Sequence, residues 1–205
     1  MKYIFMAGAP GSKWSSVAKN IYFSPDIDRS DASSQREYWH DASGTRQLMH
    51  MGAYFDPGME FDLSQQMNLE SKEHLEEFFD SAFAADGTGI RIIKSHIFAH
   101  HVDFIKETWP DCPIVLVHRP DDACLGWWVK CGHFNITYPR YDVYYKDLRH
   151  MAGIIAQQNA DILTAWEDSY FLGDNRILAT TLRIAQPPAE YYQEYKKSDI
   201  KVTVL

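Results

Sequence analysis

The sequence predicts a mixed α/β fold with three layers, in which a mostly parallel central sheet is flanked by helices. Three short, apolar, β-prone runs lie at 2–7, 90–94 and 113–117, and each precedes a segment typical of a helix. Strands that alternate with helices indicate βαβ units, whose strands run parallel. The chain has 205 residues, which is the length of one domain, so we treat 1–205 as a single domain.

The first strand, 2–7, runs into the turn sequence Gly8–Ser12, and a helix should begin at 14–16 and end before Pro25. The long polar stretch 26–62 holds several aromatic residues, so we expect an ordered surface loop with a functional role.

Six further segments follow, and apolar spacing or bounding prolines define them. They are a helix at 71–85, a helix at 99–109 ending at Pro110, a helix opening at Arg119-Pro120, a long helix within 144–172, and strands at 177–184 and 200–205.

The composition excludes several classes of protein. Hydrophobic residues make up 45% and charged residues 23%, which is ordinary for a globular chain and excludes a disordered chain, a coiled coil or a collagen-like fibre. The formal charge of -8 disfavours a general nucleic-acid binder. Three scattered cysteines favour a reducing compartment. The N-terminal apolar stretch is too short for a signal sequence, and no run reaches the roughly 18 residues of a membrane span. We therefore expect a cytoplasmic protein.

The segment Gly8–Ser16 (GAPGSKWSS) is the first candidate for chemistry. A glycine-rich turn between a strand and a helix directs backbone N–H groups at one spot, and the helix N-terminus adds positive potential that favours phosphate or sulfate. Lys13 adds a charge, and Ser15 and Ser16 add hydroxyls. The Walker pattern GxxxxGK[ST] is not met, because Ser12 precedes the lysine and Trp14 follows it. The alternative is a plain turn with a surface lysine.

Two further candidates follow buried strands. His96, in Lys94-Ser95-His96, is placed as a general base, although a packed histidine is the alternative. Arg119, in the stretch 117–128 (VHRPDDACLGWW), is suited to a bidentate phosphate contact, and the alternative is an ion pair with Asp121 or Asp122. The histidines and cysteines show no recognised metal-ligand spacing, so we expect no metal.

Together these segments resemble the P-loop-fold sulfotransferases that use 3′-phosphoadenosine-5′-phosphosulfate (PAPS). GAPGSKWSS is similar to the family's phosphosulfate loop, often GxPKSGTT, and IKSHIF at 93–98 is similar to the cytosolic stretch IKTHLP. VLVHRPDDACLGWW resembles the second phosphate-binding stretch, of the form xxxRNPxDxxxSxx. The likeness covers 1–128 in pieces, and the RKGxxGxW cap of cytosolic members is absent. The resemblance implies a P-loop-type fold.

The chain departs from the family's pattern at three positions. The family's basic residue in the first loop falls on Gly11, and Lys13 lies two residues later. In the second stretch, His118 falls on the family's arginine and Gly126 on its serine, the two groups that hold the 3′-phosphate. Arg119, one residue away from the arginine position, is the candidate to compensate. His96 matches the family's catalytic base residue for residue.

The resemblance implies in-line transfer of a sulfuryl group from PAPS to a hydroxyl or amine of a small acceptor, with adenosine 3′,5′-bisphosphate as product and no metal. His96 would remove the acceptor proton and Lys13 would stabilise the leaving oxygen. Arg119, with positions His118 and Gly126, would hold the 3′-phosphate. The 5′-phosphate would be held by the loop residues, which are Gly11, Ser12, Lys13, Trp14, Ser15 and Ser16.

The acceptor would lie over the loop 26–62 and near 133–145, where aromatic residues favour a small hydroxylated molecule. Two other functions stay open. One is a small-molecule or nucleotide kinase on the same fold, with Asp121 or Asp122 as metal-holding carboxylate. The other is a degenerate, non-catalytic nucleotide-binding protein, which the changes at Gly11, His118 and Gly126 would mark.

Overall fold

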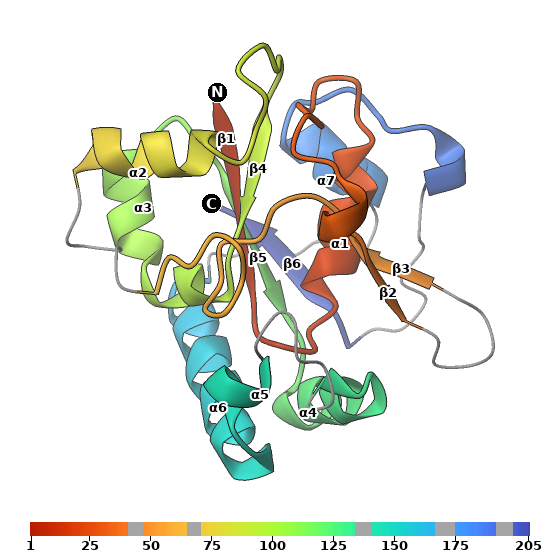
Figure 1. Ribbon diagram of the computed structural model, residues 1–205, viewed down its shortest axis with the longest axis vertical. Helices are drawn as coiled ribbons and strands as arrows, with labels where there is room; N and C mark the ends of the chain where they lie inside the picture. Colours follow the sequence, from red (N-terminus) through yellow and green to blue (C-terminus); the bar gives the residue numbers. More distant parts are fainter. Residues whose placement is uncertain (41–46, 65–70, 134–140, 167–174, 192–198) are drawn as a thin grey trace.

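The computed structural model describes residues 1–40, 47–64, 71–133, 141–166, 175–191 and 199–205. A four-stranded sheet has the order β4-β1-β5-β6, and the strands are β1 (Tyr3–Gly8), β4 (Arg91–Lys94), β5 (Ile114–His118) and β6 (Lys201–Val204) (Figure 1). β1 pairs in parallel with β4 and β5, whereas β6 pairs antiparallel with β5. The expected mixed α/β fold with a mostly parallel sheet is therefore confirmed.

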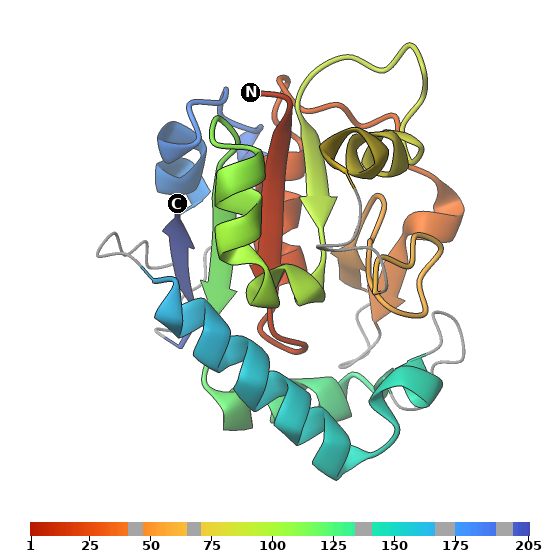
Figure 2. The same cartoon turned by 90° about the vertical axis from the view of Figure 1, so that its left-hand side faces the viewer.

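Helices cover both faces of this sheet because side chains of β1 alternate between two apolar clusters. Ile4 and Met6 face α1 (Trp14–Tyr22) and α7 (Asn175–Thr181). Tyr3 and Phe5 face the other helical layer, which crosses in front of the sheet in Figure 2. That layer comprises α2 (Lys72–Asp80), the 3₁₀ turn η2 (His96–His100), α3 (Val102–Thr108) and α6 (Leu148–Thr164).

A third apolar cluster lies at the carboxyl edge of the parallel strands. It joins Ala9, just after β1, to Cys124 and Trp128 of α4 (Asp121–Lys130) and to residues of α5 (Tyr141–Tyr145) and α6. Figure 2 shows α4, α5 and α6 gathered below the strand ends. This cluster fixes α4 against the glycine-rich turn.

Three expectations need correction. The strand predicted at 177–184 is wrong: α7 occupies most of it, because Leu178, Ala179 and Leu182 form a helical stripe packed in the same cluster as α1. The loop 26–62 contains a hairpin of β2 (Tyr38–His40) and β3 (Gln47–His50), together with a 3₁₀ turn at Ser34–Arg36.

The long helix predicted within 144–172 is interrupted. α5 ends at Tyr145, Lys146 has a positive φ of 59°, and α6 begins at Leu148, capped by the carboxylate of Asp147 on the His150 N–H at 2.8 Å. Residues 167–172 lie outside the described part. A 3₁₀ turn, Ala189–Tyr191, precedes β6. Across the part of the chain that the structure describes, no helix has the length and apolar character needed to cross a membrane.

We expect Phe5→Ala to lower the free energy of unfolding by about 3–5 kcal/mol, because it leaves a cavity in the core between the sheet and the α2–α3 helical layer. The Phe5 ring is fully buried and contacts the rings of Tyr3, Phe79, Phe98 and Trp109. Urea denaturation measures the change. Val129→Ala on an exposed face of α4 is the control and should shift stability by less than about 0.5 kcal/mol. Equal effects of the two variants would contradict the assignment of the core.

Candidate active site

Three predicted segments meet at one edge of the sheet. Because β4, β1 and β5 are parallel, the residues that follow them, beginning at Ala9, Ser95 and Arg119, leave the sheet at the same end. After β1 the chain forms β4 on one side of it and later β5 on its other side, so the order of strands in the sheet reverses at β1. Such a reversal is where open α/β sheets bind ligands.

The turn after β1 has a backbone that excludes a side chain at Gly11. Gly11 has a φ of 81°, and a Cβ built there would lie 2.0 Å from the carbonyl oxygen of Cys124 in α4. Ser12 N–H donates to the Ala9 carbonyl at 3.0 Å and closes the turn. The position that carries a basic residue in the resembled family therefore cannot carry one here without moving α4.

Lys13 takes the place of the helix N-cap of α1 in a left-handed conformation, with φ 64°. This conformation costs a non-glycine residue roughly 1–2 kcal/mol. The N–H groups of Trp14 and Ser15 begin the helix and have no acceptor within it. The Lys13 ammonium lies 4.4 Å from the centroid of the Trp127 ring. The turn thus brings Lys13 and the first two residues of α1 into the lining of one cavity.

His96 is fixed against this turn. Its Nδ1 lies 2.5 Å from the Gly8 carbonyl oxygen, which can only accept, so Nδ1 carries the proton and donates. In the neutral ring Nε2 then has a free lone pair. The ring is 4% exposed and packs on Trp14 with centroids 4.5 Å apart. His96 is therefore held in the tautomer that a general base at Nε2 requires.

Asp56 is a site residue that the sequence did not identify. Its Oδ1 accepts from the His96 backbone N–H at 2.5 Å and lies 2.8 Å from the Ser95 hydroxyl. Its Oδ2 lies 3.9 Å from His96 Nε2 and has no hydrogen-bond partner among the described residues. Complete burial raises the pKa of the Asp56 carboxyl, and the His96 charge opposes that rise. The only sequence signal was a carboxylate in the turn sequence Asp56-Pro57-Gly58.

Aromatic rings crowd the space in front of Lys13 and His96 and leave a cavity of only about 40 Å³. Tyr38 of the hairpin stacks on His50 and on His133, with centroids 5.2 and 5.5 Å apart. Burial, together with the charges of Lys94, His133 and His96, holds the pKa of His50 well below its usual value. The lining residues are Gly11, Lys13, Trp14, Ser15, Tyr38, His50, Tyr54, His96, Trp127, Trp128, His133 and Tyr141.

Arg119 holds the turn from the other side. Its Nε donates to Asp199 at 2.9 Å, and its Nη1 donates to the Gly11 carbonyl at 3.2 Å. The ion pair of Arg119 is therefore with Asp199 and not, as the alternative expected, with Asp121 or Asp122. The Asp121 carboxylate accepts from the Asn159 side-chain amide at 2.6 Å. Arg119 therefore lies beside the turn but outside the lining of the cavity.

The cavity thus collects Gly11, Lys13, Trp14, Ser15 and His96 of the predicted set. The other five predicted residues lie outside its lining. Ser12 is buried and its hydroxyl has no partner among the described residues, Ser16 is buried in the first turn of α1, and Arg119 clamps the turn. His118 packs near Trp166, with ring centroids 6.3 Å apart, and Gly126 borders open space on α4.

Within the described residues, no group of three or more His, Cys, Asp or Glu side chains is placed to hold a metal ion. Searches against protein-family profiles, curated proteins and solved structures found no significant match to this chain. The assignment of function therefore depends on the geometry of the site.

Lys94, the last residue of β4, is buried beside Tyr54, which lines this cavity. Its Nζ donates to the Met51 carbonyl and lies 4.8 Å from the centroid of the Tyr54 ring. Burial lowers the pKa of Lys94 to about 8, and the charges of Asp31 and Asp56 partly offset that effect.

We expect the stability of the protein to rise with pH between about 8 and 10.5 on account of Lys94. In that range the unfolded lysine still binds a proton and the folded one does not, so raising the pH removes a cost of folding. Between pH 7 and 9 the gain should be about 1 kcal/mol. Lys94→Met should abolish this part of the slope in urea unfolding at each pH. A slope that is the same in both proteins would contradict the buried, deprotonated lysine.

Proposed function

We propose that this chain is a PAPS-dependent sulfotransferase with a P-loop-type fold. The observation that carries the proposal is the hydrogen bond from His96 to Gly8, because it places a histidine with a free Nε2 against a glycine-rich turn suited to an anion. A base and an anion-binding turn in one cavity are what transfer of an anionic group to a hydroxyl requires.

The chain offers donors for the phosphosulfate at the start of α1. The N–H groups of Trp14 and Ser15 and the hydroxyl of Ser15 would hold the 5′-phosphate, and the positive end of α1 adds to the attraction. The Lys13 ammonium would move from the Trp127 ring to the oxygen that leaves. A cation over a half-buried ring contributes about 1 kcal/mol, so an anion can compete for it.

PAPS would supply the sulfuryl group. The acceptor hydroxyl would lose its proton to His96 Nε2 as its oxygen forms the new S–O bond. The old S–O bond breaks at the same time, and its electron pair stays on the phosphate oxygen next to Lys13. The carboxylate of Asp56, with Oδ2 3.9 Å from Nε2, would stabilise the imidazolium that results.

The 3′-phosphate would bind at Arg119, which uses two of its five N–H donors on Asp199 and Gly11. The open space at Gly126 leaves room for that phosphate on α4. A cavity of about 40 Å³ holds little more than one water molecule, so donor binding requires the aromatic rings in front of Lys13 to move. Tyr38 is the candidate ring because it lies on the hairpin.

We further propose a small-molecule acceptor and a cytoplasmic location. All three cysteines, Cys112, Cys124 and Cys131, are free thiols, and burial raises the pKa of Cys124 to about 12 and that of Cys131 to about 11. Unpaired thiols are consistent with a reducing compartment.

We expect adenosine 3′,5′-bisphosphate to bind more tightly than adenosine 5′-phosphate, with a dependence on Arg119. Isothermal titration measures both affinities. Arg119→Ala should reduce the preference for the 3′-phosphate by about tenfold, because a charge-assisted contact is lost. Asp199→Ala is the matched variant and should raise the affinity, since it removes the acceptor that holds Nε of Arg119.

Other outcomes of this titration favour other functions. Equal affinity for the two nucleotides would contradict the proposed donor site. Thermal stabilisation by Mg-ATP, and not by adenosine 3′,5′-bisphosphate, would favour the kinase. No response to either nucleotide would favour a degenerate, non-catalytic protein.

We expect His96→Asn to abolish sulfuryl transfer while leaving nucleotide affinity within about threefold. The asparagine amide keeps a donor for the Gly8 carbonyl, whereas the base at Nε2 is lost. The slow hydrolysis of PAPS, with water as acceptor, can be followed by release of adenosine 3′,5′-bisphosphate. Asp56→Asn keeps the Oδ1 contacts and should lower the rate less. Unchanged hydrolysis in His96→Asn would remove the base from the mechanism.

A further inference from the structure

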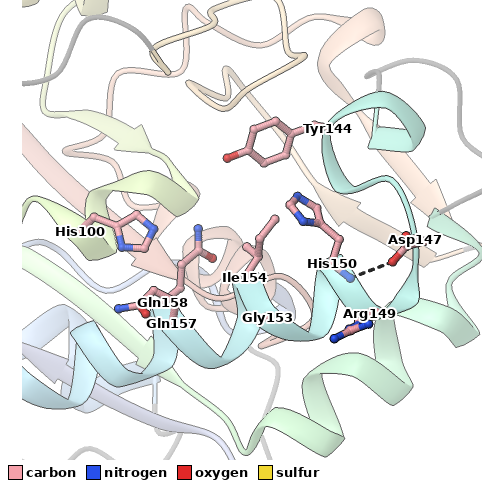
Figure 3. Close-up of a pocket in the computed structure, with 9 residues that line it drawn as sticks. All are labelled: His100, Tyr144, Asp147, Arg149, His150, Gly153, Ile154, Gln157 and Gln158. Atoms are coloured by element: carbon pink, nitrogen blue, oxygen red, sulfur yellow. Dashed lines mark hydrogen bonds between the residues drawn. The ribbon is translucent and has the colours of Figure 1, made fainter.

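A second and larger cavity, of about 500 Å³, lies along α6, and we name it the α6 groove (Figure 3). Its walls include His100 at the end of η2, Tyr144 of α5, and Gly153 and Gln158 of α6. The described residues that line it do not overlap with those that line the cavity at Lys13. Its volume is in the range of small-molecule sites.

A buried amide in the wall of the α6 groove has an unmatched acceptor. Gln158 is 1% exposed, and its Oε1 has no hydrogen-bond partner among the described residues. Figure 3 shows the amide rising from α6 between His100 and Ile154. A buried acceptor without a donor is unfavourable, and a ligand O–H or N–H in the groove would supply the missing partner.

His100 offers a second acceptor on the same side of the groove. Its Nδ1 lies 2.5 Å from Oδ2 of Asp161, and a carboxylate only accepts, so Nδ1 carries the proton. Nε2 of the neutral ring is then left with its lone pair. Asp161 also accepts from the side-chain amide of Gln157 at 3.0 Å, which fixes the carboxylate that orients His100.

Gly153 keeps the groove open. It lies within the 17-residue helix α6, where glycine is a poor choice for helix stability, and a Cβ built on it would have no neighbour within 4 Å. The missing side chain therefore leaves free volume in the wall of the groove, and packing does not account for the glycine.

We propose that the α6 groove binds a neutral, hydroxyl-rich molecule of the size of a mono- or disaccharide. Hydroxyl groups satisfy both acceptors, at Gln158 and at His100, while Tyr144 offers a ring face to the apolar side of a sugar. The rim carries charges of both signs, Asp147 and Arg149, so it does not select a net anion. The proposal concerns binding alone and does not rest on sulfuryl transfer.

The test is an NMR titration of the ¹⁵N-labelled full chain with maltose, glucose and, as a charged control, inorganic phosphate. We expect maltose or glucose to shift the amide signals of Gly153 and Gln158 in a saturable way. Gly153→Trp fills the groove and should weaken binding by at least about tenfold. Gly153→Ala is the matched control and should bind normally with a higher melting temperature.

Gln158→Met separates a binding role from a structural one. It keeps the volume of the side chain and removes the unpaired acceptor, so the melting temperature should stay the same or rise while sugar affinity falls. No response to either sugar, or binding that persists in Gly153→Trp, would overturn the proposal. A response to phosphate alone would also overturn it and would assign the groove to anions at Arg149 and His150.

Discussion

The hydrogen bond between His96 and the Gly8 carbonyl joins the carboxyl ends of two adjacent parallel strands, β4 and β1. β4 ends one residue before Ser95-His96, and β1 ends at Gly8 itself. Asp56 then binds the His96 backbone N–H, which fastens the segment after the hairpin to the same point. The His96 imidazole and the Asp56 carboxylate thus hold the glycine-rich turn, the end of β4 and the segment after the hairpin together. A buried polar group of this kind is tolerated only when its partners are in place, so the contacts depend on each other.

The second constraint acts on the other side of the turn, where backbone packs on backbone. Gly11 lies against the Cys124 carbonyl, and Arg119 binds the Gly11 carbonyl while Asp199 holds the arginine. α4 cannot approach this closely unless position 11 lacks a side chain. The cation of the turn is therefore carried by Lys13, two residues later and in a left-handed conformation. This packing explains why position 11 of the turn is a glycine and not the basic residue of the resembled motif.

Much of the sheet could be predicted from the sequence because its strands are short apolar runs bounded by glycine and proline. The runs at 2–7, 90–94 and 113–117 correspond to β1, β4 and β5, and the polar residues after them do meet. The strand predicted at 177–184 was wrong because a short apolar run does not distinguish a strand from a helix packed on one side. Asp56 was missed because its role depends on a contact across 40 residues that no local pattern encodes. The two hydrogen bonds of Arg119, to Asp199 and to the Gly11 carbonyl, could not be predicted for the same reason.

Unfavourable local features gather at the carboxyl edge of the sheet. The left-handed Lys13, the buried Lys94, and the oxygens of Ser12 and Asp56 that lack a partner among the described residues all adjoin the ends of β1 and β4. Each opposes folding when considered alone. By contrast, the amino end of β4 carries ion pairs, in which Arg91 contacts Asp28 and Asp80. Strained backbone and unpaired polar groups gathered at one end of a well-packed sheet are typical of a site that has a role besides stability. A ligand that pairs with these groups would bind where folding alone leaves them unsatisfied.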